Sequence, residues 1–452
     1  MIVMKFGGTS VQDAEAMGQV IAIVKSKLVQ RPIVVVSAMA RVTDMLIKCA
    51  QLAREGKEVE ARRLIDVLSQ RHHDTVKTLI HDSLRQRSVQ ETVDKYLEEV
   101  RIFISGLAIL GELSAKSLDA VASYGERLSS LILSIAMQEA GISAELIDAR
   151  QIIITDDNYI KAVPLLDLTW ERVNKFLRPV LMKGHVPVTQ GFISSTRDGI
   201  TSTLGRGGSD YSAALIGALL GVDVIEIWTD VDGILTADPK IVPEARVLET
   251  VTFQEASELA YFGAKVLHPS TILPAVEKDI PVHVYNTKRP ESKGTHIVST
   301  ETGEGDHKFV KSIAYKKRIT VVNVYSTRML LAHGFLKSIF EVFDKFGTPV
   351  DIVSTSEVNV SLTIDDISQL EEIVKELRTF SSVTVEHGKA IICLVGEKMR
   401  YTPGIAARVF SAVREVNINM ISQGASEINL SFIVNESDIV AAVQKLHHEF
   451  FN

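Results

Sequence analysis

The sequence predicts an α/β fold with a mostly parallel central sheet and a helical insertion, followed by two ferredoxin-like βαββαβ units. Three observations support this prediction. Short β-branched apolar runs alternate with helical stretches up to about residue 300, residues 45–116 show helical periodicity without a strand signal, and the C-terminal third repeats itself. The alternation indicates parallel strands joined by helices, and the repeat indicates two copies of a smaller unit.

Four apolar runs are expected to form buried strands of the first sheet. They read RPIVVVSAM, HVPVTQGFI, VDVIEIWTD and IPVHVYN, at residues 31–39, 185–193, 222–230 and 280–286. Nearly continuous hydrophobic strands separated by helices are typical of a parallel sheet covered on both faces. Between the first two runs, charged segments such as VDKYLEEVRIFISGLAIL predict the helical insertion.

The C-terminal repeat has an offset of 70 residues, since SEVNVSL at Ser356–Leu362 returns as SEINLSF at Ser426–Phe432. Each copy reads strand, helix, strand, strand, helix. The first copy adds a fourth strand at residues 382–388, whereas the second ends on a helix. A strand-like segment at Phe309–Tyr315 precedes both copies, so we expect it to complete the second sheet.

These patterns predict four parts of the chain. Residues 1–298 form the first domain, and the polar, glycine-bearing stretch 299–308 is a linker. Residues 316–388 form the first copy, and residues 309–315 with 389–452 form the second.

Composition places the protein among ordinary globular chains. Of its 452 residues 46% are hydrophobic, and a net charge of −7 argues against nucleic acid or an anionic membrane as a partner. The only cysteines, Cys49 and Cys393, lie far apart and indicate a reducing compartment. No signal segment precedes the first strand, and no apolar run reaches the roughly 20 residues of a membrane span. We therefore expect a cytoplasmic protein.

Two glycine-rich segments indicate phosphate binding. KFGGTS at Lys5–Ser10 ends the first strand, and TLGRGGSDYSAALIGALLG at Thr203–Gly221 opens a helix that Ser209 and Asp210 cap. Glycines let the backbone approach a ligand, and a helix N-terminus suits an anion. In open parallel sheets ligands bind beyond the carboxyl ends of the strands, where both segments fall. Lys5 precedes its glycines, unlike a P-loop lysine, and would reach phosphate oxygens from beneath the turn.

Each of these features also has a purely structural interpretation. The glycine clusters could be tight turns, Glu126 and Arg127 a solvated pair at a helix start, and Asp210 an early-helix charge. The doublets His72–His73 and His447–His448 lack the i,i+4 spacing of a helical metal site, so we expect them to be solvated. No metal site of the protein's own is expected.

Several motifs in order resemble the aspartate kinases of the amino acid kinase family. They are KFGGTSV, VVSAMARVTDML, YGERLS, GRGGSDYSA, TDVDGILTADPK, FGAKVLHP and GFL followed by VDIVSTSEV, and the resemblance covers essentially the whole chain. The length and the helical insertion are similar to the monofunctional, lysine-sensitive type, whose C-terminal repeats are ACT domains. Leu235 and Lys240 depart from the tyrosine and arginine that relatives often have in the nucleotide-binding loop.

The resemblance implies phosphorylation of the L-aspartate side chain to 4-phospho-L-aspartate, the first step towards lysine, threonine and methionine. ATP would be used with Mg²⁺, which is held mostly by phosphates and water. The attacking carboxylate is ionised at neutral pH, because an unperturbed aspartate has a pKa of about 3.9, so no catalytic base is required. Positioning and charge neutralisation would carry the rate.

The same resemblance assigns roles to individual residues. In the catalytic pair, Asp210 orients Lys5. Glu126 takes the α-ammonium group of the substrate, and Arg206 clamps a carboxylate with its planar fork. The substrate-binding residues are Thr43, Glu126, Arg206, Gly207, Gly208 and Ser209. The ATP-binding residues are Lys5, Phe6, Gly7, Gly8, Thr229, Asp230, Leu235, Lys240 and Lys265.

An end product is expected to inhibit the enzyme through the first C-terminal copy. Gly334 and Phe335 open its first helix, where free N–H groups can receive a carboxylate. Asp351 offers a negative group for an ammonium, whereas the second copy has Ile421 at that offset. The resemblance adds Met329, Ser356 and Glu357, and it implies a homodimer or dimer of dimers through the ACT domains. L-lysine is the expected effector; threonine, or both together, is one alternative, and purely structural copies are another.

Two further functions were weighed against aspartate kinase. Another acceptor on the same fold, such as glutamate, carbamate or a nucleotide, is one; Arg206 with Glu126 favours an acceptor with both carboxylate and ammonium groups. A catalytically dead amino-acid sensor is the other, and the presence of Lys5, Arg206 and Asp210 argues against it. A fused homoserine dehydrogenase is not expected, since no dinucleotide-binding domain follows the repeats.

Overall fold

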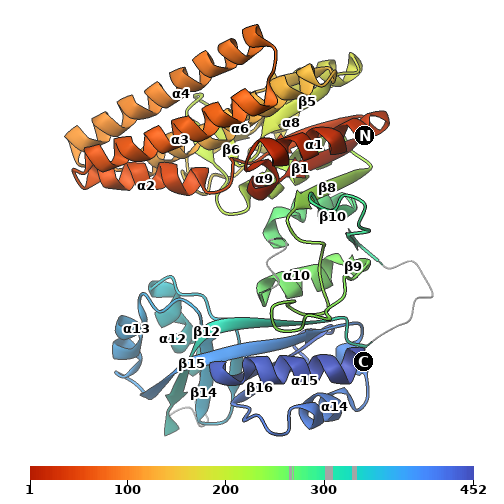
Figure 1. Cartoon of the computed structure of the whole chain (residues 1–452). Helices are drawn as coiled ribbons and strands as arrows, with labels where there is room; N and C mark the ends of the chain where they lie inside the picture. Colours follow the sequence, from red (N-terminus) through yellow and green to blue (C-terminus); the bar gives the residue numbers. More distant parts are fainter. Residues whose placement is uncertain (264–266, 268, 301–308, 328–332) are drawn as a thin grey trace. The chain divides into compact units, whose positions relative to one another are not determined.

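A computed structural model of the chain describes residues 1–263, 267, 269–300, 309–327 and 333–452 (Figure 1). The chain divides into two compact units. The first contains Met1–Ile234, Glu249–Phe253 and Val266–Glu301, and the second contains Leu235–Leu248, Gln254–Lys265 and Thr302–Asn452. Residues 301–308 of the expected linker, as well as Lys265 and Met329, lie outside the described residues.

The first unit is built on an eight-stranded sheet in which every strand pair is parallel except β10–β11. The four apolar runs form β2, β5, β8 and β10, as predicted. In sheet order the strands are β3 (Ala144–Ile147), β5 (Val186–Gln190), β2 (Pro32–Val36), β1 (Ile2–Phe6), β8 (Val224–Thr229), β10 (Val282–Asn286), β11 (Thr295–Val298) and β9 (Thr250–Thr252). A small sheet holds β4 (Ile154–Thr155), β6 (Ile193–Thr196) and β7 (Thr201–Thr203).

The predicted insertion is confirmed as a group of helices, in which long α3 and α4 lie side by side (Figure 1). Its members are α2 (Val42–Arg54), α3 (Glu58–Leu79), α4 (Ser83–Leu110) and α5 (Ala115–Ala122). The other helices that begin in this unit are η1 (Gly8–Val11), α1 (Ala14–Ser26), η2 (Leu28–Gln30), α6 (Tyr124–Glu139), α7 (Ala149–Ile152), α8 (Leu166–Met182), α9 (Gly208–Leu220), α10 (Phe253–Tyr261), η3 (Pro269–Thr271) and α11 (Leu273–Glu277).

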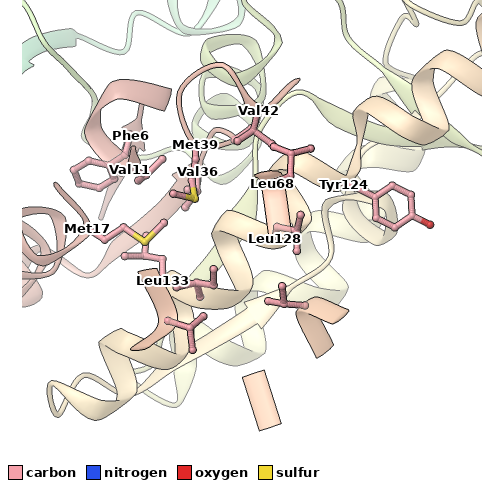
Figure 2. Close-up of a cluster of buried hydrophobic side chains, with 14 of the residues drawn as sticks. Phe6, Val11, Met17, Val36, Met39, Val42, Leu68, Tyr124, Leu128 and Leu133 are labelled. Carbon is pink, nitrogen blue, oxygen red and sulfur yellow. The ribbon is translucent and has the colours of Figure 1, made fainter. Parts of the chain in front are cut away.

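The core of the first unit supports both loops that follow its central strands. Figure 2 shows Phe6, Val11 and Met17 from the β1–α1 region gathered with Val36 and Met39 from the β2–α2 region, all of them buried. Because side chains alternate along a strand, Lys5 lies on the opposite face of β1 from Phe6. The helix α9 packs against β1.

The second unit contains one continuous six-stranded sheet. In sheet order its strands are β13 (Val353–Thr355), β14 (Asn359–Ile364), β12 (Ser312–Tyr325), β15 (Ser382–Val395), β17 (Asn429–Asn435) and β16 (Met420–Gln423). Its helices are α12 (Phe335–Lys345), α13 (Leu370–Leu377), η5 (Met399–Tyr401), α14 (Ile405–Ala412), η6 (Glu436–Asp438) and α15 (Ile439–Phe451). The two copies share β12 and β15, which pair along their length with an irregularity between Lys316 and Val321. Ser312–Lys316 pair with Ile391–Val395, beside β17, and Val321–Tyr325 pair with Ser382–Glu386, beside β14.

Two segments within the expected first domain group with the second unit. Ile313 donates its N–H to the Thr236 carbonyl oxygen at 2.9 Å, and Ile241 and Val242 belong to the hydrophobic core beneath β15 and β17. Asn429 donates to Glu258 of α10 at 2.7 Å. The division at residue 298 therefore stays a prediction.

One member of each histidine doublet is buried, so the expectation that both doublets are solvated is wrong. His72 is fully buried with Nδ1 2.6 Å from the Leu68 carbonyl oxygen, and His447 is 1% exposed with Nε2 3.0 Å from Thr236 Oγ1. Adjacent residues on a helix point about 100° apart, so one can face the core while its neighbour faces solvent. Burial lowers the pKa of His72 to about 4, which keeps it neutral.

Candidate active site

A cleft of about 390 Å³ lies at the carboxyl end of β1 in the first unit. It is lined by Lys5, Gly8, Ser37, Ala38, Met39, Ala40, Arg41, Thr43, Asp44, Glu126, Phe192, Gly205, Arg206, Gly207, Gly208, Ser209 and Asp210. Every expected substrate-binding residue and both members of the expected catalytic pair belong to this set. In the sheet, β1 lies between β2 and β8, and the cleft lies beyond the carboxyl end of β1. Ligand sites of open α/β sheets commonly occupy this kind of position.

A lysine and an aspartate from two elements form the charged centre of the cleft. Lys5 Nζ of β1 lies 2.6 Å from Asp210 Oδ1 in the first turn of α9, and both side chains are largely buried. A paired ammonium at this depth is oriented by its partner and keeps its other donors for a ligand.

The glycines before α9 bring its first turn close to the sheet. Gly205 and Gly207 have φ angles of 77° and 72°, which favour glycine, and Gly207 is the N-cap. A Cβ on Gly191 would lie 2.6 Å from the Ser209 Cβ, so this glycine also permits the close approach. Ser209, whose N–H has no hydrogen-bond partner among the described residues, lines the same cleft as Lys5, whereas the N–H groups of Gly208 and Asp210 donate to the carbonyl oxygens of Gly205 and Gly207 at 3.0 Å each.

Glu126 is a buried acid with an open hydrogen-bonding position. It lies in the first turn of α6, is 4% exposed, and its Oε2 has no hydrogen-bond partner among the described residues. Burial raises the pKa of Glu126 to about 8, while the N–H groups of Ala38 and of Glu126 itself act in the opposite direction. The interpretation of Glu126 as a solvated surface charge is therefore wrong. An ammonium group in the cleft would stabilise the ionised form.

The remaining substrate-binding candidates line the rim of the cleft. Arg206 is exposed, and no ion pair of its guanidinium is found within the described ranges. Thr43 lies in the first turn of α2, with its Oγ1 3.4 Å from the position that a Cβ on Gly125 would take. Gly125 thus lets α6 approach α2 closely enough for Glu126 and Thr43 to share the cleft.

The expected ATP-binding residues are spread over several places, of which Lys5 and Gly8 line the cleft described above. Thr229 and Asp230, at the end of β8, line a second cavity of about 420 Å³ with Thr9, Ser10 and residues of α1. Phe6 has a fully buried ring that stacks on Trp228, so only its backbone can serve a nucleotide. Leu235 and Lys240 belong to the second unit, where Leu235 accepts a hydrogen bond from Ser312 Oγ at 2.7 Å.

The expected effector residues lie around the β12–α12–β13 region of the second unit. Gly334 is the N-cap of α12 with φ 82°, and Phe335 is the first helical residue. Ser356 and Glu357 belong to the β13–β14 turn, where the Ser356 N–H donates to the Asn359 carbonyl at 2.8 Å. Asp351 has a 4% exposed side chain whose Oδ1 lies 2.9 Å from Lys316 Nζ and accepts from the Tyr261 hydroxyl at 2.6 Å.

Comparisons with known proteins identify the family of the chain. Residues 1–286 match the model of the amino acid kinase family, and residues 392–450 match an ACT domain model. The chain is 38% identical to aspartokinase 1, chloroplastic, of Arabidopsis thaliana, over 99% of this chain and 80% of the relative. It is 37% identical to lysine-sensitive aspartokinase 3 of Escherichia coli, over 100% of this chain and 99% of the relative. The chain belongs to the aspartokinase family.

Two solved complexes of one aspartokinase resemble the structure along its whole length. E. coli aspartokinase III in complex with aspartate and ADP matches with a TM-score of 0.87 at 36% identity, and its complex with lysine and aspartate matches at 0.83 and 35%. Each comparison covers 100% of both chains. Within the described residues, this aspartokinase has no helix long and apolar enough to cross a membrane, and no group of three acidic, histidine or cysteine side chains that could hold a metal ion.

Sequence reasoning missed two residues that shape this aspartokinase cleft. Asp119 of α5 is buried, and its carboxylate accepts from the N–H groups of Ile160 and Thr203, each at 2.9 Å, and from Thr203 Oγ1 at 2.7 Å. These bonds fix the end of β7 just before the glycine loop. Phe192 lines the cleft with φ 67°, and a Cβ on Gly208 would lie 2.9 Å from its ring. A lone aspartate in a helical segment gives no sequence signal for a partner 84 residues away.

Proposed function

We infer that the protein transfers the γ-phosphoryl group of ATP to the side-chain carboxylate of L-aspartate, giving 4-phospho-L-aspartate and ADP. The observation that carries this inference is one cleft lined by the Lys5–Asp210 pair, the first turn of α9, the open Glu126 carboxyl and the exposed Arg206. The product is the first intermediate on the route from aspartate to lysine, threonine and methionine.

The chemistry requires little beyond positioning and charge neutralisation. The aspartate carboxylate is already a nucleophile at neutral pH, so no group has to remove a proton. Lys5, oriented by Asp210, stabilises negative charge on the transferring phosphoryl group, and the Ser209 N–H at the start of α9 donates to one of its oxygens. ATP would be used with Mg²⁺, which would be held mostly by phosphate oxygens and water and would offset their negative charge.

Two groups of the cleft select an amino acid as the acceptor. Glu126 takes the α-ammonium group, and its buried Oε2 gains the partner that it lacks in the free protein. Arg206 binds the α-carboxylate through two parallel hydrogen bonds. This arrangement leaves the side-chain carboxylate to face Lys5, and a glutamate acceptor, one methylene longer, would displace it.

The second unit is proposed as the site of feedback inhibition by L-lysine. The resembling E. coli enzyme has been solved with lysine and aspartate. Asp351 is the acidic group for the effector's side-chain ammonium, and Gly334 and Phe335 present N–H groups to its carboxylate. Asp351→Ala should keep catalysis and lose most lysine inhibition; the variant should fold, because Lys316 keeps its second partner, Asp365, at 2.8 Å. A fully lysine-sensitive variant contradicts this assignment.

Self-association is proposed through the same unit. The strands β13 and β16 are the two edges of its sheet and lie close to each other within one chain, and neither has a strand partner on its outer side among the described residues. A homodimer is the expected minimal state, and sedimentation analysis with and without lysine measures it directly.

A hydroxylamine trap tests the catalytic proposal. Hydroxylamine converts an acyl phosphate into a hydroxamate, which forms a coloured complex with iron(III). Hydroxamate should form from ATP and aspartate, and at least about 100-fold less should form from glutamate, because the site's polar groups are then mispaired. No hydroxamate from aspartate, or equal amounts from both acids, contradicts the proposal.

A further inference from the structure

One arginine of the helical insertion donates hydrogen bonds to both loops that follow β1 and β2 beside the cleft. Arg71 of α3 donates from one terminal nitrogen to the Ala40 carbonyl oxygen and from the other to the Gln12 carbonyl oxygen, each at 2.7 Å. Gln12 follows the Gly8–Val11 turn, and Ala40 lies in the loop between β2 and α2. We propose that Arg71 is a positioning residue for phosphoryl transfer, an inference that rests on the kinase function proposed above.

The two loops that Arg71 joins already touch each other. Ala40 donates its N–H to the Gly8 carbonyl oxygen at 3.0 Å, and a Cβ on Gly8 would lie 3.0 Å from the Ala38 carbonyl oxygen. Gly8, Ala38 and Ala40 all line the cleft with Lys5. A displacement of either loop therefore changes the distance between Lys5 and the backbone groups opposite it.

The bond to Ala40 also sets the direction of the next peptide N–H. In a trans peptide the carbonyl oxygen and the following N–H point in opposite directions, so the Arg41 N–H points away from the Arg71 guanidinium. Arg41 lines the cleft, has a left-handed φ of 67°, and its N–H has no hydrogen-bond partner among the described residues. A non-glycine residue in this conformation needs its neighbours to hold it. Arg71 thus keeps one backbone donor free for an anionic oxygen of the substrates.

Arg71 has no acidic partner that would explain it as a surface ion pair. Within the described part of the chain no carboxylate lies at ion-pair distance from its guanidinium. Burial lowers the pKa of Arg71 from its usual value, although the group stays charged, and Asp13 partly offsets this effect at longer range. The guanidinium of Arg71 is therefore partly desolvated, and its partners are two carbonyl oxygens. Only a planar guanidinium, with its several N–H donors, can donate to both of them at once.

The test compares Arg71→Ala and Arg71→Lys with Arg63→Ala, an exposed arginine on the same helix. Loosened loops misplace the reacting groups, so Arg71→Ala should lower kcat by about 10- to 100-fold. The KM for aspartate should rise by a smaller factor than kcat falls, because Arg206 and the main chain of Glu126 lie on other elements, and the held loop contacts Glu126 through the Ala38 N–H alone among the described contacts. Arg71→Lys should recover part of kcat by reaching one carbonyl, and millimolar guanidinium should raise kcat of Arg71→Ala but not of the parent. Arg63→Ala should match the parent.

Each outcome has a defined meaning. A kcat within threefold of the parent in Arg71→Ala, or an equal loss in Arg63→Ala, overturns the inference. So does a loss of kcat that thermal denaturation explains by a smaller folded fraction and that guanidinium does not reverse. If Arg71→Ala does not fold, Arg71→Lys carries the same comparison of kcat and KM. A parent enzyme that makes no aspartyl hydroxamate contradicts the proposed function instead.

Discussion

Two buried carboxylates, Glu126 in the first unit and Asp351 in the second, are both assigned to the ammonium group of an amino acid, yet their surroundings differ. Glu126 has an oxygen without a partner and a pKa raised to about 8 by burial. Asp351 already contacts the ammonium of Lys316 at 2.9 Å and the hydroxyl of Tyr261 at 2.6 Å, and only its Oδ2 is unpaired. Among the described residues Glu126 has no cationic partner, whereas Asp351 has one from its own chain, Lys316.

This difference indicates two kinds of binding site. A substrate that supplies the missing ammonium of Glu126 gains a full charge-assisted hydrogen bond in a desolvated place. An effector at Asp351 has to share or displace Lys316, so its net gain is smaller and depends on how the second unit rearranges. A ligand can shift a conformational equilibrium only by its difference in affinity for the two states, and the Lys316 contact is one interaction through which they can differ.

The largest loss of activity is expected from substitution of Lys5 in the first unit. Lys5→Ala removes the ammonium that faces the transferring phosphoryl group and leaves Asp210 unpaired, so kcat should fall by about 10²–10³. Steady-state kinetics with Lys48→Ala, an exposed lysine on α2, provide the control. A kcat within threefold of the parent enzyme would remove Lys5 from the mechanism.

The next largest effect is expected at Arg206. Arg206→Lys keeps the charge but loses the paired geometry, so the KM for aspartate should rise roughly 10- to 100-fold, in line with the loss of one hydrogen bond to a charged group. The KM for ATP should change much less. Equal increases for both substrates would assign Arg206 to the nucleotide or to the fold.

The raised pKa of Glu126 predicts a pH dependence. Below about pH 8 the carboxyl of the free enzyme is protonated and must ionise before it binds an ammonium, so kcat/KM for aspartate should be about tenfold lower at pH 7 than on the plateau. Glu126→Gln should abolish this dependence together with most aspartate binding. Glu112→Gln, an exposed residue, should retain it. A profile that is flat from pH 6 to pH 9 in the parent enzyme contradicts the assignment.

The smallest effect is expected on lysine inhibition, from substitution of Lys316 beside Asp351. Lys316→Met removes the internal ammonium from Asp351, so lysine should inhibit at about two- to fivefold lower concentration, as expected for a partly exposed ion pair. Catalysis without lysine should not change. Lys337→Met is a suitable control, because the one ion pair of Lys337 within the described part of the chain is with the exposed Glu341 of its own helix. Weaker inhibition in Lys316→Met would mean that Lys316 helps to bind the effector.

The sequence predicted the features that leave a local signal. Apolar runs predicted β2, β5, β8 and β10, and the two glycine-rich segments predicted one shared site at the strand ends. The pairing of Lys5 with Asp210 came from the family resemblance. Contacts between distant segments had no such signal. The pairing of Lys316 with Asp351, and of Asp119 with Thr203, depends on how strands and helices approach in space.

The sequence also did not predict which individual polar residues are buried. His72 and Glu126 have the sequence surroundings of surface residues, and only the packing of α3 and α6 places them inside. The strands β12 and β15 show a related limit. The segment Phe309–Tyr315 was expected to complete the second sheet, and Ser312–Lys316 do pair beside the strands of the second copy, but the repeat did not predict that β12 and β15 each run unbroken through both copies.

Calorimetry of aspartate binding tests the central comparison most directly. If Glu126 is protonated in the free enzyme and ionised beside the bound ammonium, titrations at pH 7 in buffers of different ionisation enthalpy should show the release of close to one proton per aspartate. Glu126→Gln should release none, even if it binds weakly. Two results would contradict this account: proton release below about 0.2 per aspartate in the parent enzyme, or the same release in Glu126→Gln. Either would mean that Glu126 is not the carboxyl that ionises when the substrate's ammonium binds.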